Sequence, residues 1–184
     1  MIKTIALTIL VLVVVALGAV LAYATTKPDS FRVQRGIIIK APADKIFPLI
    51  NDLRAQSTWS PFEKDPDMKR THSGPPQGPG AVYEWDGNRQ VGAGRIAITG
   101  ATAPTDAKAP SQVTLALDMS RPMEAHNVVE FTLQPQGDAT TVTWTMHGAQ
   151  PYLAKVMATV IDCDKMVGSM FEEGLGKLKA LAEK

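Results

Sequence analysis

The sequence lacks the features that mark several protein classes. Its 184 residues include a single cysteine, Cys163, which excludes an intramolecular disulfide framework. It has no glycine period or low-complexity tract, and its 45% hydrophobic content is too high for a disordered or collagen-like chain. Its 19 Lys and Arg residues nearly balance 18 Asp and Glu residues, so the basic excess of a nucleic-acid-binding domain is absent. We therefore expect no nucleic-acid partner.

Charged residues are also absent from Ile5–Ala24, where Leu7–Leu21 is almost entirely Leu, Val, Ile and Ala. At ~1.5 Å per residue a helix of this run spans roughly 30 Å, the thickness of the hydrocarbon core of a bilayer. Lys3 precedes the run, and Lys27 follows it at the start of Lys-Pro-Asp. The sequence therefore predicts an N-terminal transmembrane anchor over residues 1–26.

A cleaved secretory signal is the competing interpretation, because Ala22-Tyr23-Ala24 has the small-x-small form of a cleavage site. The apolar run exceeds the roughly 7–15 residues usual for a signal, which favours an uncleaved anchor. Both interpretations place the domain outside the cytoplasm if the N-terminus stays inside. The uncleaved anchor then predicts a single-pass membrane protein with a periplasmic domain. Four basic residues close behind the run, Lys27, Arg32, Arg35 and Lys40, oppose this orientation.

Residues 27–184 have the size of one domain with a single core. Alternation of apolar residues predicts a strand over Phe31–Lys40. Apolar residues at helical spacing after Pro42 predict a helix to about Leu53, which Pro48 kinks or divides into two short helices. Five prolines and three glycines make Ser57–Gly80 mostly loop, with at most one short strand near Met68–Ser73.

Apolar and polar residues alternate in five further runs, which predicts an antiparallel sheet with one covered face. The runs are Ala81–Asp86, Gly94–Thr99, Gln112–Met119, Asn127–Leu133 and Thr140–His147. A short helical piece over Pro151–Ile161 precedes a long amphipathic helix over Asp164–Lys184. The order predicts an α+β domain in which the long C-terminal helix covers one face of a seven-stranded sheet.

Several strings within Phe31–Lys184 resemble those of the START-like (SRPBCC) superfamily, in particular polyketide cyclase/dehydrase and lipid transport proteins. They are Ile38-Ile39-Lys40-Ala41-Pro42, Trp59-Ser60-Pro61-Phe62-Glu63-Lys64, Gly80-Ala81-Val82-Tyr83-Glu84-Trp85 and Asp164-Lys165-Met166-Val167-Gly168. The resemblance implies a helix-grip fold, in which seven antiparallel strands wrap around the C-terminal helix and enclose a cavity. The fold hosts carriers, receptors and cyclases, so it indicates architecture better than chemistry.

Large aromatic and methionine side chains on the predicted inner faces are the candidate lining of this cavity. They suit an adaptable apolar pocket, although each of them equally suits an ordinary core. The candidates are Trp59, Tyr83, Trp85, Phe131, Trp144, Met146, Met166, Met170 and Phe171.

No metal site, cofactor or catalytic constellation is predicted. The spacing of His72, His126 and His147 fits no compact metal motif, and we expect each of them at the solvated surface. Cys163 has no accompanying triad arrangement and is interpreted as a helix residue.

The sequence thus predicts a membrane-tethered protein that binds or transports a hydrophobic small molecule or lipid. The alternative is a polyketide cyclase/dehydrase-like enzyme that acts on a ligand in the same cavity. A third class is a partner protein that acts through its surface, which would require a filled core and an exposed apolar patch. The sequence indicates no particular ligand, reaction or protein partner.

Overall fold

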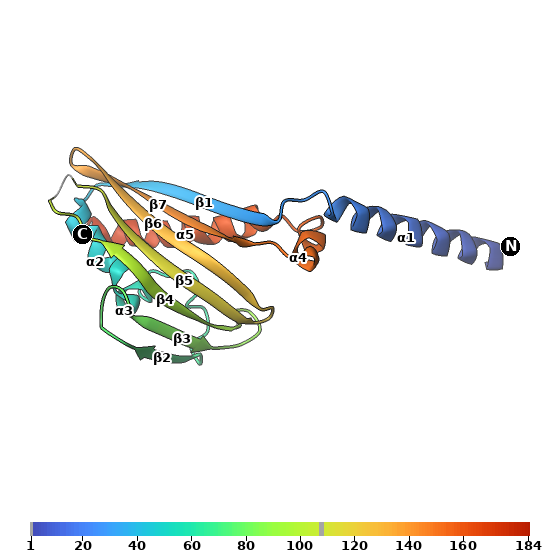
Figure 1. Ribbon diagram of the computed structural model, residues 1–184, viewed down its shortest axis with the longest axis horizontal. Helices are drawn as coiled ribbons and strands as arrows, with labels where there is room; N and C mark the ends of the chain where they lie inside the picture. Colours follow the sequence, from blue (N-terminus) through green and yellow to red (C-terminus); the bar gives the residue numbers. More distant parts are fainter. Residues whose placement is uncertain (1, 107–108) are drawn as a thin grey trace. The chain divides into compact units, whose positions relative to one another are not determined.

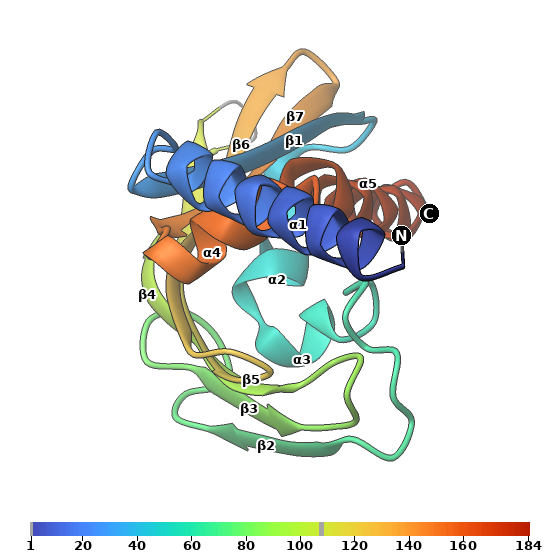
Figure 2. The same cartoon turned by 90° about the vertical axis from the view of Figure 1, so that its right-hand side faces the viewer.

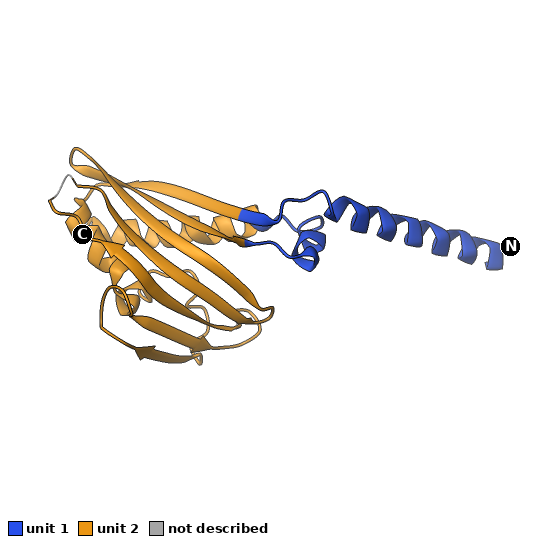
Figure 3. Cartoon of the chain, viewed as in Figure 1, with its two compact units in different colours: residues 1–31, 149–163 blue, residues 32–148, 164–184 orange. Residues whose placement is uncertain are grey.

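The computed structural model describes residues 2–106 and 109–184. The chain forms two compact units, which Figure 3 colours separately. The first comprises residues 1–31 and 149–163, and the second comprises residues 32–148 and 164–184. The predicted division between an anchor (1–26) and a domain (27–184) remains a prediction.

The first unit contains two helices, α1 (Ile2–Ala24) and α4 (Tyr152–Met157). By length and composition α1 is able to cross a membrane, and none of its apolar window is buried. Hydrogen bonds join the segments of this unit: the Tyr152 hydroxyl donates to the Leu21 carbonyl (3.0 Å), the Gln150 N–H donates to the Asp29 carbonyl (2.7 Å), and Lys155 Nζ pairs with Asp29 Oδ1 (2.6 Å).

The second unit is built on the predicted seven-stranded antiparallel sheet, drawn in Figure 1. Its spatial order is β1-β7-β6-β5-β4-β3-β2, so every pair except β1 and β7 joins strands that are consecutive in the chain. The strands are β1 (Ser30–Ile39), β2 (Lys69–Ser73), β3 (Val82–Asp86), β4 (Ala93–Thr102), β5 (Ser111–Arg121), β6 (Ala125–Gln136) and β7 (Ala139–Ala149). This arrangement confirms the predicted α+β helix-grip fold.

Figure 2 shows the sheet curving around α2 (Ala43–Asn51), α3 (Leu53–Gln56) and α5 (Cys163–Ala182). The β4–β5 register shifts between Ile98 and Gly100, and an irregularity of this kind bends a strand and increases its twist. The concave face buries apolar residues of β5, β6 and β7 against the long helix. On α5 the buried positions Phe171, Leu175, Leu178 and Ala182 recur at helical spacing.

The first helical segment divides later than Pro48, which lies inside α2. The break is at Asp52, whose backbone is extended (φ −118°, ψ 115°). Its carboxylate accepts the backbone N–H groups of Arg54 (2.7 Å) and Ala55 (3.3 Å). Such a cap satisfies donors that the first turn of a helix leaves free, so α3 starts anew at Leu53.

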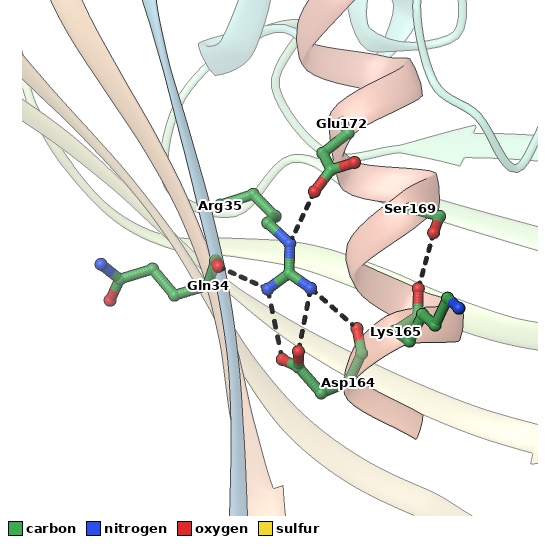
Figure 4. Close-up of polar contacts among 6 residues, drawn as sticks. All are labelled: Gln34, Arg35, Asp164, Lys165, Ser169 and Glu172. Carbon is green, nitrogen blue, oxygen red and sulfur yellow. Dashed lines mark hydrogen bonds and ion pairs between the residues drawn. The ribbon is translucent and has the colours of Figure 1, made fainter. Parts of the chain in front are cut away.

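A charged contact fastens α5 to β1, and Figure 4 shows its geometry. We call the contact of Arg35 with Asp164 and Glu172 the Arg35 clamp. The five N–H groups of the Arg35 guanidinium meet five acceptors: both Asp164 carboxylate oxygens (2.9 and 3.2 Å), the Asp164 carbonyl (3.1 Å), Glu172 Oε1 (2.9 Å) and the Gln34 carbonyl (2.8 Å). Because both carboxylates are exposed, we attribute to the clamp mainly a role in positioning α5.

Gly168 makes room for this clamp. A Cβ atom at position 168 would lie 2.0 Å from Arg35 Nη2, whereas a Cβ atom at Gly176 of the same helix would meet nothing within 4 Å. The guanidinium therefore lies directly against the helix backbone at Gly168.

We predict different outcomes for alanine at these two glycines. Gly176→Ala raises the free energy of unfolding by about 0.5–1 kcal/mol, because alanine has the higher helix propensity. Gly168→Ala gains less than this or loses stability, because the new methyl group displaces the guanidinium from its acceptors. Urea unfolding of the full chain in detergent, followed by tryptophan fluorescence, measures both, and equal gains would contradict the clamp.

Candidate ligand cavity

A cavity of about 300 Å³ lies within the second unit. Its walls come from α3, the loop after it, the middle strands of the sheet and the inner face of α5. Its lining is mostly apolar, with Ile96, Leu117 and Val129 between the larger rings. The volume is at the lower end of the range for small-molecule sites, roughly 300–1,000 Å³, which favours a compact ligand.

Stacked aromatic rings form one wall of the cavity. The Trp144 ring on β7 is parallel to the Phe171 ring on α5, with centroids 4.1 Å apart and an interplanar angle of 6°. Phe131 lies 4.8 Å from Trp144, and Trp59 meets both rings edge-on at 5.9 and 5.7 Å. Trp59 is itself fixed, because its indole N–H donates to the Leu49 carbonyl (2.9 Å). The wall is therefore rigid as well as apolar.

The structure brings eight of the nine predicted residues to this cavity. They are Trp59, Tyr83, Trp85, Phe131, Trp144, Met146, Met170 and Phe171, so all three tryptophans of the chain line it. Met166 is not among the lining residues, and 49% of it is exposed. It lies one helical turn before Met170, where the same side of α5 is no longer covered. That the eight residues contact a ligand remains a prediction.

A polar group sits at one edge of the apolar lining. The Tyr83 hydroxyl donates to Glu63 Oε1 (2.7 Å), and the second oxygen of Glu63 accepts from Arg70 Nε (2.9 Å). Burial, and then the hydrogen bond to the Glu63 carboxylate, raise the pKa of Tyr83 well above its ordinary value. Both effects stabilise the protonated phenol, which is the form that donates to Glu63.

The loop that carries Glu63 is tied in place by the same arginine. Arg70 also donates to the carbonyls of Met68 (2.7 Å) and Asp65 (2.9 Å). The buried Asp65 carboxylate accepts the backbone N–H of Asn88 (2.8 Å) in the β3–β4 loop. Two loops at the edge of the cavity are thus bonded to each other.

His72 departs from the prediction that all three histidines are solvated. Its ring stacks on Tyr83 at 4.8 Å, and its buried Nε2 has no hydrogen-bond partner among the described residues. Burial lowers the pKa of His72 below its ordinary value. The strand pairing of His72 with Tyr83 explains this position, since directly paired residues share a face.

One buried polar atom of the lining is also unsatisfied. The Nε1 atom of Trp144 is buried and has no acceptor within the part of the chain that the structure describes. An unpaired buried donor is costly, by about 1–3 kcal/mol. The close packing of the rings around Trp144 therefore leaves one donor of the wall unpaired.

Metal ions in proteins are commonly held by groups of His, Cys, Asp or Glu side chains. Over residues 2–106 and 109–184 there is no group of three or more His, Cys, Asp or Glu side chains that could hold a metal ion. Cys163 is a free, exposed thiol at the first position of α5.

The polar edge of the cavity was not predictable from a periodic pattern in the sequence. Glu63 and Arg70 lie in and just after a loop rich in proline, where no periodicity shows which side chains face inward. Arg89, in the next loop, also lines the cavity and was missed for the same reason. The string Trp59–Lys64, quoted for its family resemblance, was the one sequence feature that pointed to Glu63.

The curved sheet, the long helix and the cavity between them define a START-like protein of the helix-grip type. The chain belongs to the polyketide cyclase / dehydrase and lipid transport family, whose model matches residues 30–183. Membership of this family supports a fold that binds a hydrophobic ligand. No curated protein matches the chain significantly.

Solved structures share the fold at low sequence identity. A protein from Mesorhizobium loti is 14% identical with a TM-score of 0.57, and the match covers 82% of this chain and 96% of that one. Truncated norcoclaurine synthase from Thalictrum flavum is 9% identical with a TM-score of 0.57 (83% and 92% covered). Ginseng major latex-like protein 151 from Panax ginseng is 12% identical with a TM-score of 0.55 (85% and 100% covered). At such identities these similarities show the fold alone.

The aromatic wall predicts a contrast between two residues of α5. Phe171→Ala removes a fully buried ring from Trp144 and lowers the free energy of unfolding by about 3–5 kcal/mol. Met166→Ala changes it by less than about 0.5 kcal/mol, because the side chain is exposed. Urea unfolding of the full chain in detergent measures both, and a loss at Met166 as large as that at Phe171 would contradict the assigned lining.

Proposed function

We propose that the chain is a membrane-tethered protein that binds a hydrophobic small molecule in the cavity beneath α5. The observation that carries this proposal is the cavity itself, whose walls are rigid aromatic rings and whose lining is mostly apolar. When an apolar ligand displaces water from such an apolar surface, the free energy of the system falls, so binding is favoured. The family supports the same class of ligand.

The ligand that fits best is compact, apolar over most of its surface and polar at one end. The volume of about 300 Å³ limits its size. The Glu63 carboxylate favours a hydrogen-bond donor on the ligand at the edge of the cavity. The loop residues from Ser57 to Lys64 and from Arg89 to Val91 border the cavity, so we assign the entrance to them.

Membrane tethering is proposed from α1. Nearly all of its large apolar side chains are 45–85% exposed, and none of its apolar window is buried by the described part of the chain. The acyl chains of a bilayer would cover these apolar side chains. The helix can span the bilayer because its interior backbone N–H and C=O groups are hydrogen-bonded to one another. If the N-terminus is cytoplasmic, a single membrane crossing by α1 puts the rest of the chain on the other side. We therefore propose that the domain lies outside the cytoplasm.

Catalysis on the same ligand is the second candidate function, and the Glu63–Tyr83 pair favours it. The Tyr83 hydroxyl, once turned from Glu63 towards the ligand, would donate a hydrogen bond to the carbonyl oxygen of a bound compound. One relative in fold, norcoclaurine synthase, is named as a synthase. The chemistry would be of the cyclase type, in which ring closure of a β-keto chain releases water.

Binding is tested with two variants that place the same ring on opposite faces of β5. Leu117→Trp fills the cavity that Leu117 lines, whereas Ala116→Trp places the ring on the outer face, because neighbouring residues of a strand alternate. The full chain is reconstituted in nanodiscs, and energy transfer from tryptophan to N-phenyl-1-naphthylamine reports binding, with empty nanodiscs as blank. We expect Leu117→Trp to raise the Kd at least about tenfold, equivalent to ~1.4 kcal/mol, and Ala116→Trp to leave it unchanged. Equal affinities would contradict binding in this cavity.

Catalysis is tested with Tyr83→Phe. If the second function holds, a thioester with β-keto groups loses water in the presence of the wild-type chain, and Tyr83→Phe abolishes the product while the Kd for the naphthylamine probe stays the same. Mass spectrometry of the reaction detects the loss of water. A wild-type rate no faster than the uncatalysed rate would contradict catalysis and leave binding as the function.

A further inference from the structure

The segment around α4 carries an apolar face that protein does not cover. Helical hydrogen bonds continue beyond the end of α4, because the Ile161 N–H donates to the Met157 carbonyl (2.9 Å). Leu153, Met157, Val160 and Ile161 therefore recur three and four residues apart on one side of a helical segment. We call these four residues the α4 face.

The four side chains are unusually exposed for their type. The exposed fractions are 62% for Leu153, 39% for Met157, 79% for Val160 and 43% for Ile161. A contiguous apolar surface of this kind on a soluble protein marks a site of interaction with another protein or a membrane.

Lys155, on the opposite side of the segment, is bonded to protein and so turns the α4 face away from it. Lys155 is the only charged residue between Ala149 and Ile161. Its side chain is only 10% exposed, and its ammonium group pairs with Asp29 (2.6 Å) just beyond α1. From Tyr152 to Ile161 no other charged residue accompanies the α4 face, and the first acidic residue, Asp162, comes only after its end. A face without charges of its own is unfavourable for an ionic partner surface.

The position of α4 against α1 indicates what covers the face. The two helices pack together within the first unit, and the Tyr152 hydroxyl bonds to the carbonyl of Leu21 in the last turns of α1. Tyr23 lies at this same end, with Lys27 over its ring at 5.0 Å. Tyrosine and lysine at one end of an apolar helix are typical of the boundary between headgroups and acyl chains.

We propose that the α4 face is a second membrane contact, which inserts into the surface of the bilayer that α1 spans. The occupant is lipid, at the boundary where amphipathic segments bury their apolar side roughly 5–10 Å deep. The inference rests on the proposed membrane anchor, because the bond from Tyr152 to Leu21 sets the α4 face at the level where α1 leaves the hydrocarbon.

Two consequences distinguish this contact from a simple linker between anchor and domain. The chain touches the bilayer twice, through α1 and again some 130 residues later in the sequence, so α1 is not its only attachment. The ion pair between Lys155 and Asp29 and the bond from Tyr152 to Leu21 hold the two contacts together as one unit.

The test places an environment-sensitive fluorophore on single cysteines in the full chain. In a Cys163→Ser background we would label Val160→Cys and Leu153→Cys on the α4 face, Leu12→Cys in the middle of α1, and Gln134→Cys as an exposed position of β6 in the second unit. Each protein is reconstituted as single copies in phosphatidylcholine nanodiscs. Quenching is measured with doxyl groups near the lipid headgroup, with doxyl groups at the chain end, and with aqueous iodide.

We expect the labels at positions 160 and 153 to emit at shorter wavelength than the label at 134 and to lose intensity mainly to the headgroup-proximal doxyl lipid. The label at position 12 loses intensity mainly to the chain-end doxyl lipid, and the label at 134 only to iodide. Labels at 160 and 153 that behave like the label at 134, while position 12 is in lipid, would overturn the α4 contact and leave the anchor intact. Labels shielded from both lipid and iodide would also overturn it, because protein would then cover the face. A label at position 12 that iodide quenches would overturn both the anchor and this contact.

Discussion

The structure of the second unit depends on how closely α5 approaches β7. A Cβ atom at Gly174 would lie 2.9 Å from both Pro61 Cδ and Trp144 Cζ3, so the helix backbone rests against the indole itself. One turn earlier on the helix, Phe171 stacks on the same indole. Because large rings contribute much of the area that a core buries, this contact sets the distance between helix and sheet.

The cavity follows from this contact and from the Arg35 clamp. The clamp fastens the first turns of α5 to β1 through Asp164 and Glu172, while the buried residues from Leu175 onward pack into the core. The helix is thus held along its whole length while rigid rings, rather than flexible chains, line the space beside it. An aromatic wall cannot rearrange as easily as an aliphatic one, so the space stays open.

Much of this architecture was predictable because side chains return to the same face of a strand or helix at a fixed spacing in the sequence. Alternation placed Tyr83 with Trp85 and placed Phe131 and Trp144 on the inner faces, and the cavity contains all of them. Met166 lies on the same side of α5 but outside the lining, since helical spacing gives the side of a helix but not how far along it the cover extends.

Contacts made by loops, caps and segments distant in the chain could not be predicted from the sequence, because they follow no periodic pattern. The ion pair of Glu63 with Arg70 joins a loop to a strand, and its partners follow from the path of the loop alone. The division of the first helix at Asp52 depended on a cap, whereas the proline four residues earlier was the more visible feature. The association of α4 with α1 joins segments far apart in the chain, for which no pattern in the sequence existed.

The central claim is that the space beneath α5 holds a hydrophobic molecule. Native mass spectrometry of the full chain, released from nanodiscs prepared directly from the membranes of expressing cells, tests it most directly. The account predicts a population heavier than the bare chain by one compact apolar molecule, which organic extraction recovers and identifies. A chain that carries no such molecule, and takes up none when apolar compounds are added, would contradict the account.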